Sequence, residues 1–190
     1  MPTLLTHPAV PLALGLGLGA SRIPARLLAF GAVAAMLPDI DVLAFRFGIA
    51  YGDSLGHRGF THSLAFAALL GLMAALLARR LRSTRWTAGL FVFAATASHG
   101  LLDMLTTGGK GVALFWPLAP DRLFFPWQVI RVSPIGLDRF FGPAGAAALL
   151  SELSWVWGPS VAAVLLLWLS RRGWATASAR RQFAVEIQEG

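Results

Sequence analysis

Two histidines flank an arginine in the short segment GHRGFTHSL, which precedes a long apolar run. On one continuous helix, His57 and His62 would point about 140° apart, because each residue turns the helix by about 100°. Gly59 relieves this conflict, since His57 can stay in a loop while Gly59 or Thr61 caps a helix that carries His62. Arg58 suits bidentate recognition of phosphate or carboxylate. The same residues could also be ordinary polar residues at the start of a helix, so a binding role and a purely structural role both stay open.

A second polar pair, His99 and Asp103, lies inside an apolar stretch in SHGLLDMLTTGG. The spacing of four places both side chains on one helix face, about 40° apart. An ionisable residue in such a segment is costly and indicates a functional site by default, although a buried His–Asp pair with a packing role is the alternative. Thr106, Thr107 and the two glycines after them end this helix and offer hydroxyl and N–H groups near the same place.

Two aspartates, Asp39 and Asp41, stand in the segment LPDID. Pro38 disfavours helical backbone at Leu37, so we expect the preceding helix to end there and the chain to turn. From irregular backbone, two carboxylates two positions apart can reach one ion. Helix termination and N-capping by aspartate explain the same residues without an ion. His7, in THP near the N-terminus, is the remaining histidine.

These segments together supply imidazole and carboxylate groups without any thiolate, because the chain has no cysteine. Such donors suit zinc, manganese or iron, and six or seven of them are enough for two ions. Nucleophilic catalysis is not favoured, since there is no Gly-x-Ser-x-Gly motif. The zincin motif His-Glu-x-x-His is also missing, and the three glutamates come late in the chain, at Glu152, Glu186 and Glu189.

Composition predicts an all-α, polytopic helical membrane protein. The mean hydropathy is +0.66, and 13% of the residues are charged, against about 25% in soluble domains. The first of four apolar blocks, Pro8–Leu37, is interrupted, so we expect a hairpin of two short helices or one broken helix there. The fourth block, roughly Pro143–Ser170, is interrupted near Trp157–Pro159. We expect one membrane-embedded helical domain over residues 1–175 and a polar C-terminal tail, 176–190. The four apolar blocks are Pro8–Leu37, Phe60–Ala78, Trp86–Leu105 and roughly Pro143–Ser170.

Arginine positions predict the orientation in the membrane. Ten of the 16 basic residues fall in three clusters. If each block crosses once, all three clusters lie on one face, which the positive-inside rule makes cytoplasmic. The histidines and most aspartates then lie on the non-cytoplasmic face of a bacterial or archaeal inner membrane. The clusters serve as topology anchors, so we expect no nucleic-acid partner despite the net charge of +7. They comprise Arg22, Arg26, Arg79, Arg80, Arg82, Arg85, Arg171, Arg172, Arg180 and Arg181.

The motifs LPDID, GHRGFTHS and SHGLLDMLTTGGKGVALFWPL, together with the early THP, resemble the YdjM-type family of inner-membrane proteins. That family is regarded as membrane-bound metal-dependent hydrolases with a distant similarity to the zinc-dependent phospholipase C and P1 nuclease superfamily. The resemblance covers about residues 1–120. Family members often have a histidine where this chain has Val42. If that histidine is a metal ligand in them, the site in this chain has one ligand fewer. The resemblance implies metal ligation by His7, Asp39, Asp41, His57, His62, His99 and Asp103.

The leading hypothesis is a membrane-embedded hydrolase of a phosphoester in a lipid or another anionic amphiphile, with one or two divalent ions, Zn or Mn. Asp41 or Asp103 is the expected general base, and Arg58 the expected clamp on the phosphate. One alternative is a non-catalytic metal-binding membrane protein, such as a transporter subunit or a regulatory tether. Another is an intramembrane amide hydrolase. An open metal position facing a cavity favours an enzyme, whereas a closed ligand set favours a structural site.

Further substrate-binding candidates follow the third apolar block. Thr106 and Thr107 offer hydroxyls beside the expected metal ligands. Trp116 belongs to a loop rich in proline and aromatic residues, and aromatic rings favour the depth of the membrane interface. The loop could admit an amphiphilic head group or serve as a plain interfacial anchor, and the two roles are compatible.

Overall fold

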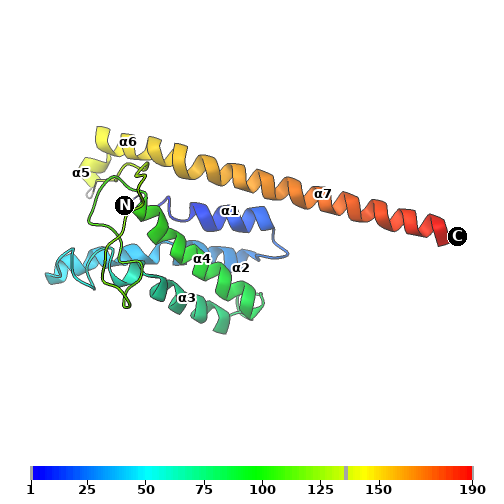
Figure 1. Ribbon diagram of the computed structural model, residues 1–190, viewed down its shortest axis with the longest axis horizontal. Helices are drawn as coiled ribbons and strands as arrows, with labels where there is room; N and C mark the ends of the chain where they lie inside the picture. The colour runs from blue at the N-terminus through cyan, green and yellow to red at the C-terminus, as the bar shows by residue number, and fades with distance from the viewer. Residues whose placement is uncertain (1, 135–136, 190) are drawn as a thin grey trace.

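The computed structural model describes residues 2–134 and 137–189, with side chains described for residues 2–134 and 139–173. Figure 1 shows a bundle of short helices beside one long helix. In the described part of the chain, all regular elements are helical, and the only β-type pairings are two isolated bridges, Thr106 with Ile130 and Val112 with Leu123. The all-α fold class is confirmed.

The first apolar block forms the expected hairpin of short helices, α1 (Ala9–Leu18) and α2 (Ala25–Ala34). Gly19 ends α1 with a φ of 84°, a left-handed value that favours glycine. Gly31 on α2 lets Phe91 approach closely, since a Cβ there would lie 2.4 Å from the Phe91 ring. The hairpin is therefore packed tightly against the next part of the bundle.

The backbone after α2 differs from the expectation. We expected the helix to end at Leu37 and the chain to turn, but a 3-10 helix, η1 (Leu37–Phe47), continues from α2 after two turn residues. The reason is the place of Pro38 in the first turn of η1, where proline lacks only an N–H that would have no helical partner. Asp39 and Asp41 therefore project from helical backbone.

The second and third blocks form an antiparallel pair, α3 (Leu64–Leu76) and α4 (Arg85–Met104). Both helices have side-chain N-caps, in which Ser63 accepts from Phe66 N and Thr84 accepts from Thr87 N. The helices touch closely at Gly71, where a Cβ would lie 2.9 Å from the Gly89 carbonyl oxygen. A short 3-10 turn, η2 (Phe60–His62), leads into α3.

The fourth block becomes one long helical arm, which lies along α1 and runs on past the bundle (Figure 1). The interruption expected near Trp157–Pro159 is a π-helical segment, so the arm continues without a break. Residues 176–189 end α7 as helix, and the side chains of the expected polar tail lie outside the described residues. The arm comprises α6 (Pro143–Glu152), η3 (Leu153–Trp157) and α7 (Gly158–Glu189), and a separate short helix, α5 (Leu137–Phe140), precedes it.

Two stretches of the described chain are long and apolar enough to cross a membrane, Ala25–Phe47 and Pro143–Gly173. Helices α1 and α3 are apolar but shorter, and α4 is not among the candidate spans, so the expectation of four apolar membrane blocks is not confirmed. Many large apolar side chains are exposed, among them Leu69, Leu72 and Leu166. Outward-facing leucines of this kind are expected where lipid tails replace water.

The turns and the ends of the short helices gather at two opposite ends of the bundle (Figure 1). The α1–α2 turn and the α3–α4 turn lie together at one end, which we call the arginine end. The segment before α1, the end of α2 and the C-terminus of α4 meet at the opposite end. A core between α1, α2, α3 and α4 fixes this arrangement and includes Leu27, Ala74, Ala88 and Val92.

Candidate metal centre

The end of the bundle opposite the arginine end collects the seven predicted ligands from four separate segments. One precedes α1, two stand in η1, two belong to the loop and turn before α3, and two lie on α4. All seven side chains are buried, with exposed fractions from 0% to 7%. The motifs scattered through the first hundred or so residues therefore meet in one place. They are His7, Asp39, Asp41, His57, His62, His99 and Asp103.

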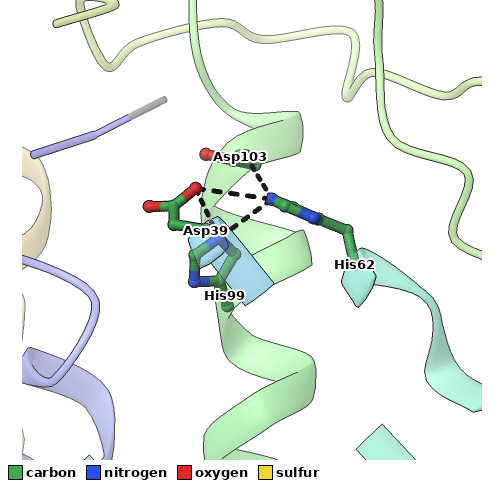
Figure 2. A group of neighbouring side chains, drawn as sticks. All are labelled: Asp39, His62, His99 and Asp103. Carbon is green, nitrogen blue, oxygen red and sulfur yellow. Dashed lines mark hydrogen bonds and ion pairs between the residues drawn. The ribbon is translucent and has the colours of Figure 1, made fainter. Parts of the chain in front are cut away.

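Four of these side chains turn one atom each toward a common point (Figure 2). His62 Nε2 lies 3.0 Å from His99 Nε2 and 3.3 Å from Asp103 Oδ2. Asp39 Oδ1 lies 3.7 Å from His62 Nε2 and 3.5 Å from His99 Nε2. Tetrahedral zinc with bonds of about 2.0–2.2 Å separates its ligand atoms by about 3.3–3.6 Å. The spacing fits a single small cation.

Partners behind the two imidazoles determine which nitrogen faces this point. His99 Nδ1 lies 2.7 Å from the Ala35 carbonyl oxygen, which can only accept, so Nδ1 must carry the proton. His62 Nδ1 lies 3.1 Å from Asp41 Oδ2. In the neutral rings both Nε2 atoms therefore carry lone pairs, and these face each other. Only a cation or a proton between them makes this arrangement favourable.

The carboxylates at the same point also require a positive charge. Both oxygens of Asp39 and both oxygens of Asp103 are buried without a hydrogen-bond partner in the described part of the chain, as are both ring nitrogens of His7. Buried unpaired charges of this kind cost several kcal/mol unless a counter-ion compensates them. The Arg58 guanidinium, 2.8 Å from Asp103 Oδ2, supplies only part of that compensation. The donor set fits a divalent ion.

The protonation of two histidines follows from their surroundings. Burial alone disfavours a charged His62 ring, but contacts with Asp103, Asp39 and Asp41 outweigh burial and raise the pKa of His62 to about 10. The ring is therefore charged at neutral pH in the metal-free protein. Burial, assisted by His99, lowers the pKa of His7 well below its ordinary value, so His7 is neutral. His7 stacks on His99 with the ring centres 3.5 Å apart.

A second group, Asp41, His57 and His62, shares His62 with the first. Its members already bind each other, since His57 Nδ1 lies 2.6 Å from Asp41 Oδ1. Asp41 Oδ2 accepts from the Arg58 backbone N–H and from the Thr61 hydroxyl. Both oxygens of Asp41 therefore already have partners. This favours a role for Asp41 in orienting His57 and His62, and it disfavours a role as the general base.

Arg58 lies at the centre of the loop before α3 and is fully buried. Besides the contact with Asp103, its guanidinium donates to the Gly108 carbonyl at 2.9 Å and to the Thr106 hydroxyl at 3.0 Å. Its φ of 63° is unusual for a residue other than glycine and indicates that the surroundings force the conformation. These contacts favour Arg58 as a residue that positions Asp103, while its role as a phosphate clamp stays a prediction.

The other predicted substrate contacts lie around this group. Thr106 is buried and its hydroxyl also donates to the Asp103 carbonyl at 2.7 Å. Thr107 is exposed, and its hydroxyl accepts from Val132 N at 3.3 Å. The Trp116 ring packs against Phe60 with centres 4.9 Å apart. None of these contacts tests a role in substrate binding, which stays a prediction.

The sequence interpretation missed one buried carboxylate that holds the N-terminal segment. Glu152 on α6 is 1% exposed. Its oxygens accept from Thr3 N, Thr3 Oγ1 and Thr6 Oγ1, each at 2.6 Å. Thr6 immediately precedes His7, so Glu152 fixes the chain that brings His7 to His99. An ionisable residue inside an apolar block was the available signal.

The class of protein that fits this fold and site is a helical membrane protein with a buried His/Asp cluster that could hold a metal ion. The chain belongs to the YdjM inner membrane protein family, whose model matches residues 1–177. It is 51% identical over 173 residues to inner membrane protein YbcI of Escherichia coli strain K12, a match that covers 90% of this chain and 100% of that protein. No solved structure matches the chain. The distant similarity to the P1 nuclease superfamily stays a prediction.

Proposed function

We propose that the protein is an inner-membrane, metal-dependent hydrolase of a phosphoester in a lipid or another anionic amphiphile. The observation that supports it most strongly is the pair of Nε2 atoms, on His62 and His99, that face each other 3.0 Å apart between two buried carboxylates. Asp39, His62, His99 and Asp103 would hold the ion. When bound, a divalent cation such as Zn or Mn supplies Lewis-acid polarisation of a phosphoryl oxygen and activation of water.

The chain's own residues would divide the remaining work. Asp103 Oδ1 has no hydrogen-bond partner among the described residues, so it could accept a proton from the attacking water. Arg58 would hold the other oxygen of Asp103 and offset the buried negative charge. His7 is neutral and lies with its Nε2 3.7 Å from Asp39 Oδ2, where it could serve as a further ligand or as a proton carrier.

The proposed topology is multi-pass, with the metal centre toward the non-cytoplasmic face. Its support is the separation of the arginine-rich turns from the His/Asp cluster at opposite ends of the bundle (Figure 1). Basic turns are retained on the cytoplasmic side during insertion. A head group carrying the phosphoester would then reach the metal centre from the outer leaflet.

A non-catalytic metal site is the second candidate, and burial is the observation that favours it. The four grouped donors are at most 7% exposed. Closed sets of four protein ligands are typical of structural zinc, whereas catalytic zinc keeps one position open. The amide hydrolase has less support, because Glu152, the glutamate whose side chain the structure describes, already accepts three hydrogen bonds from Thr3 and Thr6.

Two measurements on detergent-purified full-length protein separate the candidates. Elemental analysis should give at least one Zn or Mn per chain. Hydrolysis of bis-p-nitrophenyl phosphate and of short-chain phospholipids should then depend on that metal, with turnover lost on chelation and restored by the ion. Bound metal with no turnover of any phosphoester would support the structural site, and absence of metal would remove both candidates.

A further inference from the structure

A cavity of about 800 Å³ lies at the arginine end, between the α1–α2 turn and the α3–α4 turn. Its volume falls in the range of about 300–1,000 Å³ that is typical of small-molecule sites. The turns that line it lie at one end of the bundle, and the segments that carry the His/Asp cluster meet at the opposite end (Figure 1). We propose that this cavity binds the phosphate-bearing head group of an anionic membrane lipid.

Three arginines line the cavity: Arg22, Arg79 and Arg82. The sequence contains no aspartate or glutamate in residues 1–38 or 54–102, so α1, α2, α3, the two turns and α4 up to Leu102 can supply no counter-ion, and Asp103 lies at the opposite end of α4. Guanidinium groups pair with phosphate through two parallel hydrogen bonds and are preferred to lysine for that purpose. The cavity therefore selects an anion, and phosphate suits its donors.

The backbone brings two of these arginines together. Arg82 N donates to the Arg79 carbonyl at 3.2 Å, which closes a tight turn. Arg82 has a φ of 57°, a left-handed conformation that is unusual outside glycine and persists only where the surroundings impose it. The other turn is tied to this one, because Arg26 donates to the Arg80 carbonyl at 3.4 Å. The walls of the cavity are thus fixed to each other.

Additional donors surround the same space. The hydroxyl-bearing residues Ser21, Ser83, Thr84 and Thr87 line it, and α4 begins there with Thr84 as its N-cap. A helix N-terminus carries a partial positive charge and favours phosphate. Together with the three arginines, these groups resemble a phosphate-binding site.

The apolar part of the lining indicates a lipid in preference to free phosphate. Leu18, Ile23 and Pro24 complete the wall. Leu76, the last residue of α3, and Trp86, in the first turn of α4, are 76% and 81% exposed. Tryptophan is enriched at the membrane interface, and basic pockets between membrane helices bind anionic head groups. An acyl chain could therefore leave the cavity along apolar helix surface while its phosphate stays among the arginines.

The test compares two triple variants of the full-length protein, each of which removes three positive charges near the arginine end. The cavity variant is R22Q/R79Q/R82Q, and the control is R80Q/R85Q/R172Q, whose arginines do not line the cavity and which keeps the Arg26 contact between the two turns. Binding of short-chain phosphatidylglycerol and phosphatidylcholine is measured by native mass spectrometry in detergent. We expect wild type and control to prefer phosphatidylglycerol by at least tenfold, and the cavity variant to lose that preference.

Equal loss in both triple variants would overturn the proposal, because charge alone would then explain binding. Competition by inorganic phosphate at the same concentration as the lipid would also overturn it and make the ligand a free anion. A lysine triple, R22K/R79K/R82K, guards against misfolding: it should keep part of the preference. Unchanged metal content in the cavity variant would confirm that the distant metal centre is intact, so the result does not depend on the proposed hydrolase.

Discussion

The Nε2 atoms of His62 and His99 face each other at 3.0 Å, and each ring is held from behind by a protein oxygen. The Ala35 carbonyl accepts from His99 Nδ1, and Asp41 faces His62 Nδ1. Metal-ligating histidines usually have such a partner, which fixes the tautomer and the direction of the lone pair. The relationship makes metal occupancy and proton occupancy of His62 mutually exclusive.

A graded loss of metal follows from the different roles of the histidines. His99→Ala removes one of four donors and should weaken metal binding by more than about 100-fold, since outer partners alone are worth about 10–100-fold. His57→Ala removes a partner of Asp41 and should weaken binding by that smaller factor. Competition with a chelator measures both. Ser98→Ala is the matched control, because the Ser98 hydroxyl donates only to the Ala95 carbonyl. Wild-type affinity in His99→Ala would contradict the assignment.

The raised pKa of His62 predicts how metal binding and stability depend on pH. The metal must displace the proton on Nε2, so affinity should rise with pH up to about pH 10. Calorimetry in buffers of different ionisation enthalpy should show release of about one proton per ion bound.

Stability of the metal-free protein should change in the opposite direction. The folded-state pKa of His62, about 10, lies above the unfolded value of about 6.5. The charged ring therefore contributes its full stabilisation below about pH 6.5 and loses it as the pH rises through 10. Melting temperature should fall over that interval in the metal-free wild type, and the decline should be smaller in His62→Ala. A parallel decline in both proteins would mean that another group titrates.

Substitution of Arg58 distinguishes a role in positioning Asp103 from a role in binding the substrate. Both partners of its contact with Asp103 are fully buried, and breaking such a pair typically costs about 3–5 kcal/mol. Arg58→Ala should therefore lower the free energy of unfolding by that amount and weaken metal binding, and Arg58→Lys should recover only part of it. The exposed Arg46→Ala is the control. Normal stability and metal content with lost turnover would instead make Arg58 the phosphate clamp.

The absence of cysteine makes the membrane topology easy to test. Ser21 at the arginine end and Ser54 in the loop near His57 are both exposed. Single substitutions Ser21→Cys and Ser54→Cys would each provide one thiol for a membrane-impermeant maleimide. We expect Ser54→Cys to react in spheroplasts and Ser21→Cys only in inverted vesicles. Labelling of both from the same side would contradict opposite locations for the two ends.

The sequence could predict which residues meet, because proline, glycine and apolar spacing place His7, Asp39, His62 and His99 at helix ends that a bundle brings together. Other features depend on tertiary contacts that no local pattern contains. The Ala35 carbonyl is such a case, since its partner His99 is 64 positions away. The same applies to the burial of Arg58.

The backbone conformation after Pro38 is a second feature that the sequence did not determine. Pro38 is compatible both with a chain turn and with the first turn of a new helix, and the sequence alone favoured the turn. The structure has the helix, η1, so that Asp39 and Asp41 face different partners. Asp39 therefore belongs to the group of four side chains that could hold an ion, whereas Asp41 contacts the Nδ1 atoms of His57 and His62.

Glu152 should act on the metal centre only through His7. Glu152→Gln replaces one acceptor oxygen by an NH₂ group facing the threonine donors, so the free energy of unfolding should fall by about 1–3 kcal/mol. Metal affinity should also fall, because Thr6 and His7 would no longer be held against His99. In a His7→Ala background, Glu152→Gln should leave metal affinity unchanged while still lowering stability. Additive losses of affinity in the double variant would show that Glu152 reaches the site by another route.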